Sequence, residues 1–68
     1  MESKLVFNVD NNIIELQEKT NIFSPEVILV IENNRYIGYI NKYSEDQLHM
    51  IKSRLIAGWT YRELNLYA

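Results

Sequence analysis

The chain has 68 residues and a formal net charge of −2, with one histidine and no cysteine. This length predicts one domain, and the composition excludes disulfides and thiolate metal sites, while His49 alone cannot build a zinc site, so we expect no metal and no cofactor. A core of fewer than roughly 70–80 residues seldom supplies more than about 3–5 kcal/mol, so we expect a homodimer to complete the fold.

The N-terminal segment predicts a β-hairpin. Residues Lys4–Val9 alternate between apolar and polar side chains, as a half-buried strand does. Asp10-Asn11-Asn12 suits a tight turn, and residues 13–18 return as a second strand. A helix over residues 14–19 is the alternative, because several of these residue types are good helix formers. The inward side chains expected of this hairpin are Leu5, Phe7, Val9, Ile14 and Leu16.

Residues 20–25 (TNIFSP) are predicted to be a loop that leads into a third strand. Val27–Glu32 is apolar on both faces and rich in β-branched residues, which indicates a strand covered on both faces. One terminal helix can cover only one face of a small sheet. The other face must meet the N-terminal hairpin, a bent part of the sheet, or another subunit.

The turn Asn33-Asn34 leads to a fourth strand over residues 35–43. Strict alternation places Tyr36, Gly38 and Ile40 on one face, and Ile37 and Tyr39 on the other. A glycine in the middle of a strand often marks a β-bulge or a close approach of another backbone segment.

Residues 44–63 carry helix signals at both ends. Ser44 and Gln47 predict a capping box, followed by Glu45 and Asp46 in the first turn. Gly58 can end the helix in the left-handed conformation. The apolar face is expected to contain Leu48, Ile51 and Leu55, widened by Ile56 and Ala57.

A second capping box, Thr60 with Glu63, predicts a short final helical turn within residues 61–67. The sequence therefore predicts an α+β fold: a small antiparallel sheet of two β-hairpins, then a C-terminal helix and the final turn. The whole chain, residues 1–68, forms this single domain.

No pattern in the sequence predicts enzyme activity. Ser53 follows His49 by four residues, but two exposed polar residues on a solvated helix explain this pair. Two glycines cannot form a phosphate-binding glycine-rich loop, and no G-x-S-x-G nucleophile motif is present. We therefore expect a non-catalytic protein.

Residues 50–67 resemble a helix-turn-helix unit, with a glycine and a hydroxyl cap between two helical patterns. This resemblance implies the alternative function, a DNA-binding transcriptional regulator. Its nucleic-acid contacts would come from Lys52, Arg54, Tyr61 and Arg62. The net negative charge opposes the electrostatic attraction that non-specific DNA binding requires.

The aromatic residues are the strongest indication of a binding surface, because aromatic side chains with polar tips are enriched at interfaces. Trp59 and Leu64 are expected to close one end of the core. The residues predicted to contact a partner are Tyr36, Tyr39, Tyr61, Arg62 and Tyr67.

These features predict a small regulatory protein that binds a host macromolecule, most readily a protein, and that belongs to the class of accessory regulators carried by phages and mobile elements. We expect a cytoplasmic location and no membrane contact, because no apolar run approaches the roughly 18–20 residues needed to cross a bilayer and no signal-peptide pattern opens the chain.

Overall fold

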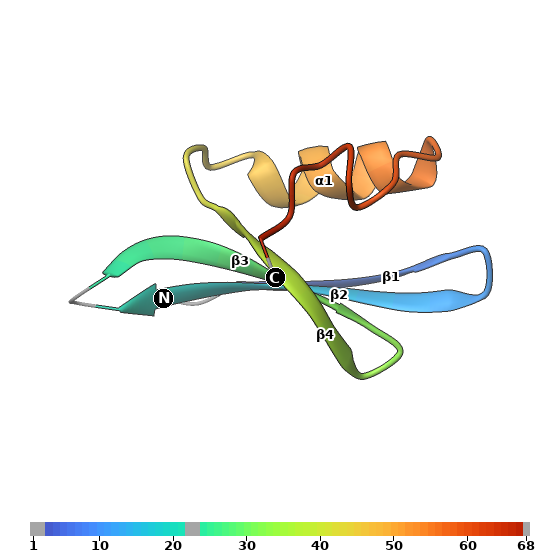
Figure 1. The fold of residues 1–68 in the computed structure, drawn as a ribbon, viewed down its shortest axis with the longest axis horizontal. Helices are drawn as coiled ribbons and strands as arrows, with labels where there is room; N and C mark the ends of the chain where they lie inside the picture. Colours follow the sequence, from blue (N-terminus) through green and yellow to red (C-terminus); the bar gives the residue numbers. More distant parts are fainter. Residues whose placement is uncertain (1–2, 22–23, 68) are drawn as a thin grey trace.

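The fold is one antiparallel sheet with a helix across one face (Figure 1). The computed structural model describes residues 3–21 and 24–67. The strands lie in the order β1-β2-β3-β4, and the helix follows them, so the predicted α+β fold is confirmed. The elements are β1 (Lys4–Val9), β2 (Asn12–Asn21), β3 (Ser24–Glu32), β4 (Arg35–Asn41) and α1 (Gln47–Ile56).

Both predicted Asx turns form hairpins of the same geometry. Asp10 and Asn11 have φ angles of 50° and 68°, and Asn33 and Asn34 have φ angles of 50° and 67°. Two successive positive φ angles define the type I′ turn, whose twist matches that of the flanking strands. The side chains of Asn12 and Asn33 are hydrogen-bonded at 3.0 Å, which links the two turns.

The predicted second strand is confirmed, and one expectation about the middle of the chain is wrong. The helical alternative over residues 14–19 does not form, because Ile14 and Leu16 alternate into the core as strand residues. The predicted loop over residues 20–25 is too long, since β2 extends to Asn21 and β3 begins at Ser24. Ile22 and Phe23 lie outside the described residues.

The predicted faces of β4 are partly wrong, because a β-bulge interrupts the strand. Val30 pairs with Gly38 while Ile31 pairs with Tyr36, so the ladder leaves Ile37 as the extra residue. An extra residue shifts the alternation by one position. Tyr36 and Tyr39 therefore share a face, and Ile37 packs against the core.

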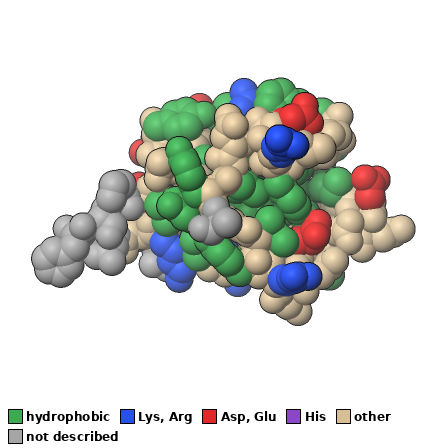
Figure 2. Space-filling model, in the orientation of Figure 1, with side chains coloured by type: hydrophobic (Ala, Val, Ile, Leu, Met, Phe, Trp, Pro, Cys, Tyr) green, Lys and Arg blue, Asp and Glu red, His purple; other side chains and the backbone are tan. Residues whose placement is uncertain are grey.

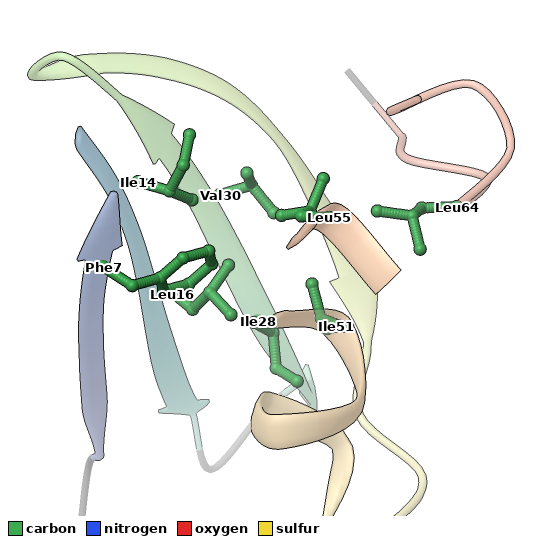
Figure 3. Close-up of a cluster of buried hydrophobic side chains, with 8 residues drawn as sticks. All are labelled: Phe7, Ile14, Leu16, Ile28, Val30, Ile51, Leu55 and Leu64. Carbon is green, nitrogen blue, oxygen red and sulfur yellow. The ribbon is translucent and has the colours of Figure 1, made fainter. Parts of the chain in front are cut away.

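The core lies between α1 and the inner face of the sheet, which is the face toward the helix (Figure 3). Alternate residues of the first three strands supply one side of it, as the strand pattern predicts. Ile51 and Leu55 of α1 close it, and Leu64 seals one end. The buried side chains are Phe7, Ile14, Leu16, Ile28, Val30, Ile51, Leu55 and Leu64.

The start of α1 differs from the predicted capping box. The Ser44 hydroxyl accepts the N–H of Asp46 at 3.2 Å, and the Gln47 amide oxygen accepts the N–H of Tyr43 at 2.8 Å. Both bonds are shifted by one residue from a true box. The two acidic residues precede the helix, so its first turn contains no acid.

Gln47 joins the end of β4 to the start of α1. Its side chain is 1% exposed. Besides accepting the Tyr43 N–H, its amide nitrogen donates to the carbonyl of Asn41 at 2.9 Å. Gln47 thus satisfies one backbone donor and one backbone acceptor of the turn that precedes α1.

Gly58 ends α1 as predicted, with a φ of 103°. The N–H of Gly58 donates to the Leu55 carbonyl at 3.1 Å, and the N–H of Trp59 donates to the Arg54 carbonyl at 3.0 Å. This pair of bonds is the Schellman motif. Ile56 and Ala57 were expected to widen the buried face, which is wrong: both are exposed, because the buried stripe ends with Leu55.

The C-terminal segment, residues 59–67, runs back across the inner side of the sheet (Figure 1). The capping box of Thr60 and Glu63 is confirmed, with the Glu63 N–H to Thr60 Oγ1 at 3.2 Å and the Thr60 N–H to Glu63 Oε1 at 3.0 Å. It opens a series of hydrogen-bonded turns, in which the Leu64 N–H donates to the Thr60 carbonyl at 3.2 Å and the Asn65 N–H to the Arg62 carbonyl at 3.1 Å. In the part of the chain that the structure describes, no helix is long and apolar enough to span a membrane.

Candidate functional site

The candidate site is the face of the sheet that points away from α1, which we call the outer face. The helix α1 and the C-terminal segment both pack on the core from the inner side of the sheet (Figure 1). The strand registers assign its residues, because cross-strand partners point to the same face. They are Lys4, Val6, Asn8, Ile13, Glu15, Gln17, Lys19, Val27, Leu29, Ile31, Tyr36, Tyr39 and Asn41.

This face exposes large apolar side chains. Val6 is 53% exposed, Ile13 55% and Tyr36 51%. The three outward apolar residues of β3 (Val27, Leu29 and Ile31) are only half-buried. The strand that the sequence predicts to be covered on both faces is therefore covered by α1 on one face alone, among the described residues.

Tyr67 extends this face beyond β4. Its N–H donates to the Tyr39 carbonyl at 2.9 Å and its carbonyl accepts the Tyr39 N–H at 2.8 Å. Residues that exchange two bonds in this way point their side chains to the same side, and the two rings lie with centroids 5.4 Å apart. Tyr67 stays 53% exposed.

The charges in the middle of the outer face are paired within it. The Lys4 ammonium lies 3.6 Å from a Glu15 carboxylate oxygen, and the Gln17 amide donates to the same carboxylate. The centre of the face thus combines apolar and aromatic area with a paired charge.

A cleft of about 400 Å³ opens beside Tyr67, between the C-terminal segment and the end of β4. Figure 2 shows hydrophobic side chains gathered on this side of the molecule, around the C-terminus. Tyr43 is 73% exposed at its rim. Arg54 and Trp59 lie on its other wall, with the guanidinium 4.6 Å from the centre of the indole ring.

Trp59 was expected to close the core, which is wrong. It is 39% exposed, and its ring supports the Arg54 guanidinium, while Leu64 is 8% exposed and does close the core. A stacked cation covers the ring face that would otherwise need burial. The sequence contained a signal for this pair, because Arg54 and Trp59 flank the helix end that brings them together.

Tyr61 and Arg62 do not lie with the other predicted contact residues. Tyr61 packs on the core from the helix side, and its hydroxyl donates to a Glu32 carboxylate oxygen at 2.8 Å. Burial of the Tyr61 phenol raises its pKa, and the hydrogen bond to Glu32 raises it further by a smaller amount. Arg62 is exposed on the C-terminal segment. The structure thus brings together Tyr36, Tyr39 and Tyr67.

Residues 50–67 do not form the second helix that a helix-turn-helix unit requires. Residues 61–65 form turns, and Tyr67 is a β-bridge residue, so the described chain contains no recognition helix after Gly58. Lys52 lies with its ammonium 5.7 Å from the centre of the Phe7 ring, and Arg54 stacks on Trp59.

A charged cluster lies where β2, β3 and the end of β4 meet. The Lys42 ammonium pairs with the Glu18 carboxylate and lies 3.3 Å from a Glu26 carboxylate oxygen. The hydrogen bond from Lys42 holds the pKa of Glu18 below its ordinary value, and the hydrogen bond to Glu18 raises the pKa of Lys42.

In residues 3–21 and 24–67, no group of three acidic or histidine side chains is placed to hold a metal ion.

No family model, no curated protein and no solved structure matches this chain.

Proposed function

We propose that the chain is a non-catalytic binding module that acts by docking an apolar surface of another protein on its outer face. The observation that carries this proposal is the row of exposed apolar and tyrosine side chains on a sheet face that no described segment covers. When the apolar surface of a partner covers such a patch, both surfaces release water. This release supplies the favourable free energy of association.

The chemistry of the face favours a protein partner over a nucleic acid. The charges at its centre, Lys4 and Glu15, pair with each other, and Lys19 adds one further charge to the face. Nucleic-acid binding draws most of its affinity from unpaired cations that displace counterions from phosphates. A role as a regulator carried by a phage or mobile element is part of this proposal.

The test is affinity capture from a lysate of the native host with three forms of the chain. The double variant Ile13→Ser/Tyr36→Ser removes two anchors of the outer face, which are more than half exposed. The control Ile56→Ser removes a side chain of similar exposure, 58%, from the helix. Any retained protein is then purified and its Kd measured against all three forms.

The proposal predicts a protein that binds the wild type and the Ile56→Ser control equally, and the double variant at least tenfold more weakly. Equal binding of that protein by all three forms would overturn it. Retardation of a random DNA duplex at low salt, lost steeply as salt rises, would favour the DNA-binding alternative instead.

A further inference from the structure

The two edge strands of the sheet, β1 and β4, differ in whether their outward backbone groups have hydrogen-bond partners. At the β4 edge, Tyr67 satisfies both backbone groups of Tyr39, and the Gln47 side chain donates to the Asn41 carbonyl. These contacts block the edge against another strand, as natural sheets commonly do. At the other edge, β1 pairs with β2 on one side, and no described strand pairs with it on the other side.

The free backbone groups of β1 belong to Lys4, Val6 and Asn8. In a two-residue type I′ hairpin the closing pair, here Val9 with Asn12, is hydrogen-bonded, and hydrogen-bonded pairs alternate along the ladder. The Glu18 N–H donates to the Ser3 carbonyl at 2.8 Å, which fits the same phase. The even-numbered residues therefore direct their N–H and C=O groups away from the sheet.

The sequence of this strand is self-complementary about Val6. An antiparallel copy centred there places Val6 opposite Val6, and Lys4 opposite Asn8, with hydrogen bonds exchanged by each of these pairs. On the inner face, Leu5 would lie opposite Phe7, so the apolar core would continue across the junction. The two copies of Lys4 would be separated by four residues along the strand, about 14 Å, which exceeds the screening length of about 8 Å at physiological salt.

We propose that β1 pairs antiparallel with β1 of a second copy, about a two-fold axis through Val6, to form one continuous sheet. The second copy is the occupant that the pattern favours, because apolar residues meet apolar residues and no like charges face each other. The axis is perpendicular to the sheet, so both helices lie on one side and the two outer faces join on the other. This pairing uses the strand edge and not the outer face, and so does not depend on the proposed function.

The test substitutes Val6, because the two-fold axis places this residue opposite Val6 of the second copy. The Val6→Lys variant places two ammonium groups face to face, and Val6→Glu places two carboxylates there, whereas a mixture of the two variants places opposite charges together. Val6 is 53% exposed, so neither change buries a charge, although the Val6→Glu variant places a second carboxylate opposite Glu15 of β2. Sedimentation equilibrium gives the mass, and far-UV circular dichroism confirms that each variant is folded.

The wild type is expected to have twice the mass of the 8.1 kDa chain. Each single variant should dissociate at least tenfold more readily, and the mixture should form a heterodimer. A wild type that is monomeric at all concentrations, or folded single variants that dimerise as tightly as the wild type, would overturn the proposal. The Ile13→Ser/Tyr36→Ser variant should remain dimeric, which separates this proposal from the proposed function.

Amide hydrogen exchange supplies a second measurement with an internal control. In the dimer the N–H groups of Val6 and Asn8 should exchange slowly, and they should exchange rapidly in Val6→Lys. The N–H of Phe7, which faces β2, should stay protected in both. Rapid exchange at Val6 and Asn8 in a wild-type dimer would show that the copies join elsewhere, and would refute the pairing.

Discussion

A β-carbon on Gly38 would stand 2.6 Å from the carbonyl oxygen of Tyr67, closer than any real contact of this kind. Gly38 thus lets the C-terminal segment reach β4 and pair with Tyr39. The close backbone approach expected of a mid-strand glycine is confirmed, as is the neighbouring bulge.

We predict that Gly38→Ala displaces the C-terminal segment from β4. Because the two hydrogen bonds between Tyr39 and Tyr67 would be lost, the free energy of unfolding should fall by about 1–3 kcal/mol. Chemical denaturation measures this change, and the Tyr67 amide should lose its protection from exchange. Gly58→Ala is the control: its strain comes from a φ of 103°, and it should leave the Tyr67 amide protected. Retained protection in Gly38→Ala would contradict the prediction.

Gln47→Ala should be among the most destabilising polar substitutions in the chain. It leaves the Tyr43 N–H and the Asn41 carbonyl without their partner in a partly buried turn. The expected loss in the free energy of unfolding is about 2–4 kcal/mol. Ser53→Ala, at an exposed position of the same helix, should change it by no more than about 0.5 kcal/mol. Equal effects of the two substitutions in urea titrations would refute this role of Gln47.

Acid should weaken the fold partly through Glu18. Because Lys42 lowers the folded-state pKa of Glu18 from 4.5, its contribution to stability is complete above that pH and is lost as the pH falls through the folded-state pKa. Glu63 contributes in the same direction, since hydrogen bonds from Thr60 lower its pKa. Thermal melts of Glu18→Gln should show a smaller drop in Tm below pH 4.5 than the wild type. An unchanged acid profile would contradict this assignment.

Alkali should weaken the fold through Tyr61. Burial, and then Glu32, raise its folded-state pKa above the ordinary 10.0, so the stability from the protonated phenol is complete below that pH and declines above it. Tyr61→Phe should cost about 1–2 kcal/mol at neutral pH and should flatten the alkaline decline. Tyr43→Phe, at a tyrosine that is 73% exposed, is the matched control and should change neither.

The hairpins were predictable because their signals are local. Asx residues at two turns, and alternation in Lys4–Val9, determine backbone conformation within a few residues. The faces of β4 were not predictable from alternation, since a single extra residue at Ile37 reverses the pattern after it.

The candidate site depended on contacts between distant residues. Tyr39 and Tyr67 were both predicted to contact a partner, but only the close approach at Gly38 shows that they are neighbours. Tyr61 has the same residue type and lies on the opposite side of the sheet, because the turn after Thr60 directs it to Glu32. Sequence spacing contains no information about that direction.

The proposed pairing of β1 requires that a second copy of the chain completes the sheet. Sedimentation equilibrium of the unmodified protein over a wide range of concentrations tests this claim most directly. We predict a mass twice that of the 8.1 kDa chain, with dissociation on dilution. A single mass of 8.1 kDa at every concentration would contradict it.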